Sequence, residues 1–370
     1  MSSPTTPFHL TKKTDTVKTS TLLPLTILAA ATAAFAQGPL TPPPGAPAPV
    51  MKSLDQIEAR TPLVADQPGV SINANGTITI SQSGSYYLTG NLTLTGSFAS
   101  GILVQASHVT LDLNGFTLTH TTGTGGDAVV VMAPNVTVLN GSIRGGTTVT
   151  GSTFTLAGWD EGVTTTLAHS NLVVQNVSVT GVRTNGIYMS YQGSRVENCS
   201  VHTVGGTGIL ASSISLSTAR KTGNTAIAAS SDPDSGSISD CFGECIAPTG
   251  SGIFAPDGVI TNSRGISVGG YGINGETVSN CYGTSESNTG LHALIANNCR
   301  GISSSGTGLS GTSVINCHGQ STSGNFGLTS TLATSSVGSR SGGVGLSAVT
   351  ANGCHVTAGT VSATNKYNMP

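Results

Sequence analysis

The chain has 370 residues, of which 50 are glycine, only 8% are charged and 4% are aromatic, while hydrophobic residues still account for 37%. This composition excludes the charge-rich, apolar-poor pattern of disordered chains and favours many short strands joined by tight turns. The formal net charge of −2, with no Lys/Arg cluster beyond the N-terminus, gives no electrostatic footprint for binding nucleic acid.

Residues 1–36 have the pattern of a signal peptide. Lys12, Lys13 and Lys18 precede the apolar run LLPLTILAAATAAFA, which ends in a small-x-small cleavage motif at Ala36. We expect cleavage after Ala36, and therefore a secreted or cell-surface protein with no membrane span in its mature form. An uncleaved anchor is the alternative, although the run is short for a membrane span.

Residues 37–50, QGPLTPPPGAPAPV, form a Pro-rich linker. Residues 51–100 are expected to hold an N-terminal cap and the first strands. Leu54 and Ile57 predict one short capping helix that ends before Pro62. After it, apolar residues alternate with period two, which indicates strands, and no other helix is predicted.

Residues 101–370 are repetitive. A small residue followed by an aliphatic one opens each unit, and the last intervals between the aliphatic residues are 18, 18, 19 and 18 residues. The aliphatic positions are Ile102, Val129, Val163, Ile187, Ile209, Ile227, Ile253, Ile273, Leu291, Leu309, Leu328 and Leu346. A second column, with an interval of 18, consists of Asn262, Asn280, Asn298 and Asn316, and a cysteine follows Asn at Cys281, Cys299 and Cys317.

Such a period with strand composition predicts an all-β, single-stranded parallel β-helix, or solenoid, of about twelve turns. Each turn would consist of three short strands, with successive turns ~4.8 Å apart. Equivalent residues then stack. We expect the aliphatic column to fill the core, the Asn column to form an amide ladder at a corner, and the cysteines after it to point inward. We expect a monomer.

The opening segment SGSYYLTGNLTLTGSFASGILVQASHVTLDLNGFTLTH and the repeated NCYG and SGTGL motifs resemble secreted bacterial right-handed parallel β-helix proteins of the pectate-lyase-like superfamily. The resemblance implies a right-handed coil. A left-handed hexapeptide helix would also fit an 18-residue period, but strict six-residue periodicity is absent. The resemblance also implies that a lyase or hydrolase would carry acids, with or without calcium and Arg/Lys, on the outward face of one sheet.

The residue after each core aliphatic should point outward on that sheet. These residues are Leu103, Val130, Thr164, Tyr188, Leu210, Ala228, Phe254, Asn274, His292, Ser310, Thr329 and Ser347. None is Asp, Glu, Arg or Lys, so this column supplies neither the paired carboxylates of glycoside hydrolysis nor a calcium site.

The strongest cluster with chemistry lies in the longest excursion between units, roughly 145–162. Trp159 is the only tryptophan, and Asp160 and Glu161 follow it. Trp159, with Tyr188 and Tyr191 one turn later, could bind a sugar, and Asp160, Glu161 and Arg183 are the catalytic candidates. The alternative is that Trp159 packs a loop against the coil and the acids are solvated. The histidines lack metal-ligand spacing, so neither a metal nor a cofactor is predicted.

The seven cysteines are expected to be mostly buried thiols, because stacked Cβ atoms ~4.8 Å apart exceed the spacing that a disulfide needs. A disulfide between Cys241 and Cys245 remains an alternative. Two functions also remain open. The first is an exported, non-catalytic β-solenoid that binds an extracellular polysaccharide or a cell-surface component as a matrix or adhesion protein. The second is a polysaccharide lyase or glycoside hydrolase near the 145–162 excursion.

Overall fold

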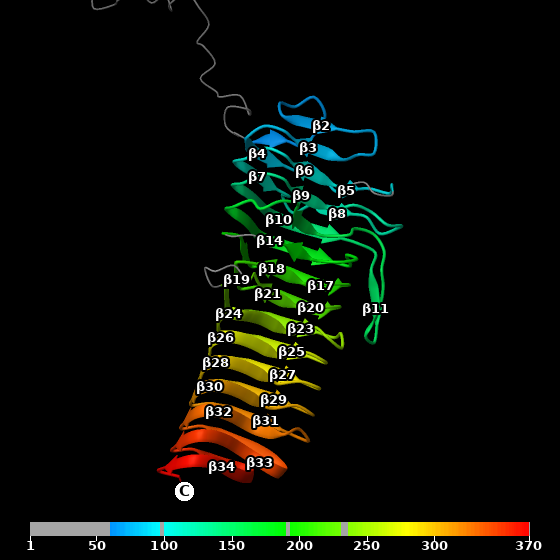
Figure 1. Ribbon diagram of the computed structural model, residues 1–370. Coiled ribbons are helices and arrows are strands. Elements are labelled where there is room, and N and C mark those ends of the chain that lie inside the picture. The colour runs from blue at the N-terminus through cyan, green and yellow to red at the C-terminus, as the bar shows by residue number, and fades with distance from the viewer. Residues whose placement is uncertain (1–59, 97–99, 190–192, 231–235, 370) are drawn as a thin grey trace, which may run out of the picture. The chain divides into compact units, whose positions relative to one another are not determined.

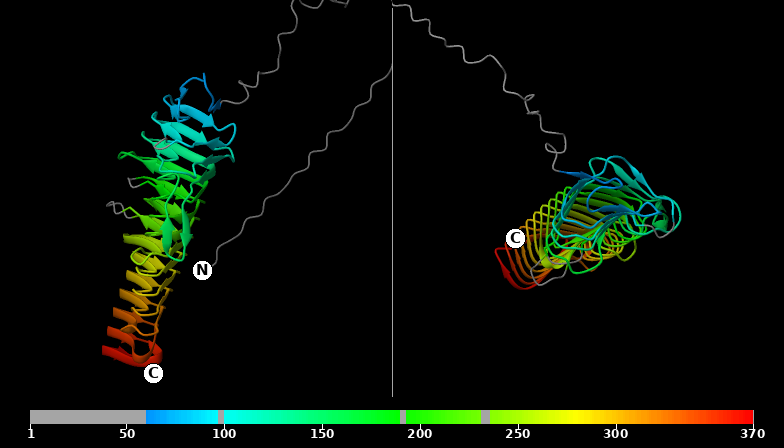
Figure 2. Two further views of the ribbon diagram at one scale, coloured as in Figure 1. Left: turned by 90° about the vertical axis from the view of Figure 1, so that its right-hand side faces the viewer. Right: turned by 90° about the horizontal axis from the view of Figure 1, so that it is seen from above.

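The computed structural model describes residues 60–96, 100–189, 193–230 and 236–369. The signal peptide, the Pro-rich linker and the capping helix predicted near Leu54 and Ile57 lie outside the described residues. Within them the chain is all-β: 32 strands join in one hydrogen-bonded sheet that coils turn upon turn, and two more form a separate hairpin. Figure 1 shows the stacked turns, and the second view of Figure 2 looks down them. No helix in the described part of the chain is long and apolar enough to cross a membrane.

Each turn contributes strands to three faces, and strands on one face pair in parallel. The first face contains β3 (Ile78–Ile80), β6 (Ile102–Val104), β9 (Val129–Val131), β13 (Val163–Thr165), β15 (Ile187–Tyr188), β18 (Ile209–Ala211), β21 (Ile227–Ala229), and the beginnings of β24 (Ile253–Thr261), β26 (Ile273–Ser279), β28 (Leu291–Asn297), β30 (Leu309–Ile315) and β32 (Phe326–Thr334).

The second face contains β1 (Thr61–Pro62), β4 (Gly84–Tyr87), β7 (Val109–Asp112), the beginnings of β10 (Val136–Arg144) and β14 (Leu172–Thr180), β16 (Arg195–Glu197), β19 (Ser213–Ser215), β22 (Ser237–Ser239), and the ends of β24, β26, β28, β30 and β32.

The third face contains β5 (Leu92–Thr93), β8 (Thr117–Thr119), the ends of β10 and β14, β17 (Ser200–Val204), β20 (Thr218–Thr222), β23 (Phe242–Cys245), β25 (Arg264–Ser267), β27 (Tyr282–Ser285), β29 (Arg300–Ser303) and β31 (His318–Ser321). The last two strands, β33 (Val337–Asn352) and β34 (His355–Tyr367), run through all three faces. Among the described residues, the antiparallel pairings are those of β2 (Val70–Ile72) with β3 and of β11 (Thr148–Thr150) with β12 (Thr153–Thr155) in the hairpin.

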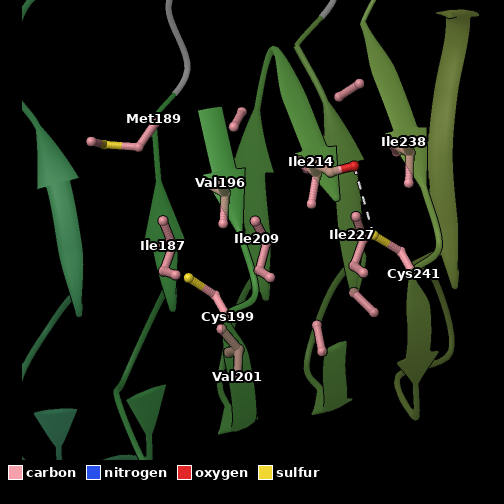
Figure 3. Packing of buried hydrophobic residues seen from close by; sticks show 14 of the residues in the cluster. Ile187, Met189, Val196, Cys199, Val201, Ile209, Ile214, Ile227, Ile238 and Cys241 are labelled. Carbon is pink, nitrogen blue, oxygen red and sulfur yellow. Dashed lines mark hydrogen bonds between the residues drawn. The ribbon is translucent and has the colours of Figure 1, made fainter. Parts of the chain in front are cut away.

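The aliphatic column predicted from the repeats is confirmed throughout. Every predicted member pairs with the next in register, and the column extends by one turn at each end, to Ile78 and Val361. Figure 3 shows Ile187, Ile209 and Ile227 in a row in the core. A glycine precedes most of these aliphatic residues, with alanine at Ala128 and Ala226. Space requires glycine at Gly290, where an added Cβ would lie 2.3 Å from the carbonyl oxygen of Ile302.

The Asn ladder is also confirmed, at the corner between the second and third faces. Asn280 Nδ2 donates to Asn262 Oδ1 at 3.3 Å, and Asn298 Nδ2 donates to Asn280 Oδ1 at 2.8 Å. These asparagines have φ between 49° and 55°, and Asn316 has φ 51°. Asn tolerates this left-handed conformation better than most residues, which explains its recurrence. Leu216 occupies the same corner with φ 50° and is 56% exposed, so it interrupts the ladder.

From the turn of Asn198 onward, the residue after this corner points inward and is either cysteine or serine. The column consists of Cys199, Ser217, Cys241, Ser263, Cys281, Cys299, Cys317, Ser336 and Cys354, and each donates to the carbonyl oxygen two residues before it. Several also accept a backbone N–H from the preceding turn: Cys281 Sγ accepts from Ser263 at 3.4 Å, and Ser336 Oγ accepts from Cys317 at 3.1 Å. The column therefore satisfies backbone groups inside the core.

All seven cysteines are buried free thiols, so Cys241 and Cys245 do not form the disulfide left open by the sequence. Figure 3 shows Cys199 and Cys241 directed into the core. Burial raises the pKa of both of these thiols to about 11. These thiols remain protonated at neutral pH and are poor nucleophiles.

Candidate functional site

The predicted excursion between units is the antiparallel hairpin of β11 and β12. At its base the Thr147 hydroxyl donates to the Ala157 carbonyl oxygen at 3.2 Å and accepts the Ala157 N–H at 3.1 Å. Leu156 rests over Gly205, where an added Cβ would lie 2.5 Å from Leu156 Cδ2. Figure 1 shows the hairpin along the side of the coil. It therefore covers the corner between the third and first faces.

Trp159 follows this hairpin in the chain and is fully buried. Its ring centroid is 5.0 Å from that of His120, with the two planes at 43°, and His120 is also fully buried. The expectation that Trp159 binds a ligand is therefore wrong in this structure, because the indole has no exposed face. The alternative from the sequence, in which it packs the loop against the coil, is correct.

The two acids after Trp159 lie at the surface of this corner with Arg183. An Arg183 guanidinium nitrogen pairs with Asp160 Oδ1, and the Asp160 side chain is 37% exposed. Glu161 Oε1 accepts a hydrogen bond from Asn185 Nδ2 at 2.6 Å. The structure therefore brings together the catalytic candidates Asp160 and Arg183, and holds Glu161 beside them.

Asp127 belongs to the same corner and was not among the predicted site residues. Its Oδ1 accepts the Glu161 N–H at 3.1 Å. Asp127, Glu161 and Asn185 each stand two residues before a core aliphatic, at Val129, Val163 and Ile187. That common offset is a signal in the sequence that could have revealed the stack. We call Asp127, Asp160, Glu161, Arg183 and Asn185 the acidic corner.

Asp127 in the acidic corner has a raised pKa. Burial, followed by the charge of Glu161, raises the pKa of Asp127 from 3.8 to about 6. A carboxyl group with this pKa can give or take a proton near neutral pH. Within the described residues, however, no three His, Cys, Asp or Glu side chains are arranged to hold a metal ion.

The column predicted to point outward on the first face is aligned as expected, since each residue pairs in register with the next, from Leu103 to Ser347. The expected exposure does not hold at Val130, Thr164 and Ala228, which are buried. Tyr188, Phe254 and His292 in this column are half-buried. The His292 ring centroid is 5.7 Å from that of Tyr271 on the neighbouring corner. The predicted ligand residue Tyr191 lies outside the described residues.

The comparisons with known proteins agree on the fold. The model of the right-handed beta helix region matches residues 68–253, and no curated protein matches the chain. The A-module of the Azotobacter vinelandii mannuronan C-5 epimerase AlgE6 is similar in structure, with a TM-score of 0.51 and 10% identity over 78% of this chain and 91% of that one.

Two other similar structures have lower scores. The Acinetobacter baumannii bacteriophage Fri1 tailspike gp49, a capsular polysaccharide depolymerase, has a TM-score of 0.30 and 12% identity over 76% of this chain and 52% of that one. The catalytic domain of a GH87 alpha-1,3-glucanase has a TM-score of 0.29 and 13% identity over 76% and 60%. With the family match and the stacked parallel turns taken together, the chain belongs to the right-handed β-helix family.

Proposed function

We propose that this protein is an exported, non-catalytic β-helix that binds a polysaccharide of an extracellular matrix or cell surface through its first face. The observation that carries the proposal is the outward column of that face, in which the rings of Phe254 and His292 alternate with the polar side chains of Asn274 and Ser310 over consecutive turns. Tyr188 stands in the same column three turns before Phe254. Aromatic rings pack against the apolar faces of sugars, and hydroxyls and amides hydrogen-bond their hydroxyl groups.

The proposal is also supported by the chemistry of this face. Its outward column contains no Asp, Glu, Arg or Lys, whereas glycoside hydrolysis uses two carboxyl groups within ~10 Å of each other. The similar structures include proteins whose names describe action on mannuronan, capsular polysaccharide and α-1,3-glucan. The signal-peptide pattern before Ala36 would place the protein where such polymers occur.

A glycan array probed with the mature protein tests binding, and assays for reducing ends and unsaturated uronides on the bound polymers test catalysis. We expect binding without product release. Phe254→Ala should weaken binding about tenfold, because aromatic contacts in such sites contribute about 1–1.5 kcal/mol. Phe154→Ala, on the hairpin and away from the first face, is the matched control. Equal binding by wild type and Phe254→Ala would contradict the assignment of this face.

The second candidate function is a polysaccharide lyase or hydrolase at the acidic corner. It is favoured by the raised pKa of Asp127, which suits a general acid or base, and by the nearby Arg183, which could neutralise a substrate carboxylate. Product release that is lost in Asp127→Asn and Glu161→Gln, but kept in Phe254→Ala, would establish this candidate over the non-catalytic one.

A further inference from the structure

The third face carries an outward column in which aromatic and cationic side chains alternate. Phe242, Arg264, Tyr282, Arg300 and His318 pair in register over consecutive turns, on strands β23, β25, β27, β29 and β31. In β25 and β29 the arginine is exposed while the glycine after it is buried, which fixes the outward direction of the column. We call these five residues the arginine–aromatic stripe.

The rings of the stripe hold its guanidinium groups by stacking. The Arg264 guanidinium lies 5.7 Å from the centroid of Phe242 and 5.2 Å from that of Tyr282, so it is sandwiched between two rings. The Arg300 guanidinium lies 5.8 Å from the Tyr282 centroid on the next turn. Cation–π contacts of this kind fix a flexible side chain before any ligand arrives, which lowers the entropic cost of binding.

The two arginines have no acidic partner in the described part of the chain. The ion pair on this face is between Arg220 and Glu244, at 3.3 Å, while Arg300 Nη2 donates to the neutral Gln320 Oε1, also at 3.3 Å. Arg264 and Arg300 are both exposed. Their N–H groups therefore remain available to an anion, and guanidinium pairs best with planar carboxylates.

The spacing of the stripe is regular and parallel to the coil axis. Arg264 and Arg300 are separated by one intervening turn, which places them about 10 Å apart at ~4.8 Å per turn. A straight, rigid row of separated positive charges matches an extended polymer that presents a carboxylate to the same side at intervals. It matches nucleic acid less well, because base stacking needs open ring faces and the rings of Phe242 and Tyr282 are contacted by guanidinium groups.

We propose that the arginine–aromatic stripe binds an acidic polysaccharide bearing uronate carboxylates, with the sugar chain parallel to the coil axis. The carboxylates accept hydrogen bonds from Arg264 and Arg300, and the neighbouring ring edges contact the sugar backbone. This surface lies on the third face, and the proposal does not depend on what the first face binds.

The test is a calorimetric titration of the mature protein with polyuronate oligosaccharides of increasing length, and with the same polymer after reduction of its carboxyl groups to alcohols. Arg264→Gln and Arg300→Gln should each weaken binding of the polyuronate about tenfold, and the double variant about a hundredfold. Arg195→Gln, which removes an exposed arginine from the second face, should bind like wild type. Affinity should rise with oligomer length until the ligand spans both arginines.

Salt and the aromatic residues give independent readouts. The logarithm of the affinity should fall with the logarithm of the salt concentration, and the slope should be shallower in the double variant. Tyr282→Leu keeps both charges but loses the stacking, so it should weaken binding a few-fold. The proposal is overturned if the double variant binds the polyuronate as wild type does, if the carboxyl-reduced polymer binds equally well, or if single-stranded DNA binds more tightly. Phe254→Ala separates this result from the first-face proposal, because it should leave polyuronate binding at the stripe unchanged.

Discussion

Leu216 interrupts the Asn ladder, and replacing it should stabilise the protein. Its φ of 50° forces a branched, bulky side chain into the left-handed region, at a cost of about 1–2 kcal/mol that asparagine largely avoids. Leu216→Asn would also place an amide that donates to Asn198 Oδ1, as Asn198 Nδ2 donates to Asn176 Oδ1 at 2.7 Å in the preceding turn. One such bond contributes about 0.5–1.5 kcal/mol.

The loss that opposes this gain is small. Leu216 is 56% exposed, so removing its side chain sacrifices at most about 1 kcal/mol of apolar burial. We therefore expect Leu216→Asn to raise the free energy of unfolding by about 1 kcal/mol. Leu216→Ala loses the same burial while keeping the strained backbone and forming no amide bond, so it should be about 1 kcal/mol less stable than wild type.

Urea unfolding followed by circular dichroism measures both variants, with the midpoint and slope compared against wild type. The difference of about 2 kcal/mol between the Asn and Ala variants isolates conformation and ladder bonding from burial. Leu216→Gly relieves the strain without an amide and should fall between them. Equal midpoints for the Asn and Ala variants would refute the view that the corner selects asparagine for its conformation and its amide.

Three further predictions concern the acidic corner and the inward thiols. Because burial and Glu161 raise the pKa of Asp127 to about 6, the folded state binds a proton more readily than the unfolded state, and wild-type stability should fall as pH rises from about 4 to about 6. Asp127→Asn keeps an acceptor for the Glu161 N–H but has no titrating carboxyl at residue 127. Urea unfolding should therefore show the variant to be about 1–2 kcal/mol more stable than wild type at pH 7.5 and equally stable at pH 3.5. If the variant lost stability with pH as wild type does, Asp127 would not be the cause of the loss. In the same assay, Cys281→Ser should leave the free energy of unfolding nearly unchanged. Cys281→Val should lower it by about 1–3 kcal/mol, because the Ser263 N–H loses its acceptor. Equal losses of stability in both variants would show that the volume of the side chain matters and its hydrogen bond does not. A thiol reagent should modify none of the seven cysteines in the native protein and all of them in denaturant, and rapid native labelling of any one would contradict the burial described here.

The vertical columns of the fold could be predicted from the sequence because stacking converts a repeat interval into a position in space. The intervals placed Ile273, Leu291 and Leu309 in one core column, and Asn262, Asn280 and Asn298 in one ladder. The serines of the inward column, such as Ser263, were missed because the cysteines were matched by residue type, whereas the position selects a small side chain that both donates and accepts.

The candidate site was less predictable, because corners and hairpins do not follow the strand alternation. Nothing in the order of residues around Trp159 distinguishes a ring buried in the core from one exposed on a loop. Asp127 lies in a different unit from Glu161, so their contact emerges only when the units are superimposed. The arginine–aromatic stripe escaped notice because only the outward side of the first face had been aligned.

The hairpin of β11 and β12 shows how this architecture can acquire new parts. Asn135 and Asn171 are 36 residues apart, yet Asn171 Nδ2 donates to Asn135 Oδ1 at 2.8 Å, much as residues 18 apart do elsewhere. A corner can thus absorb a doubling of the turn's length while the layers on either side remain aligned. Insertions and duplicated units can be added at such corners while the packing of the core stays the same. Ancestral variants could therefore gain surface loops one at a time.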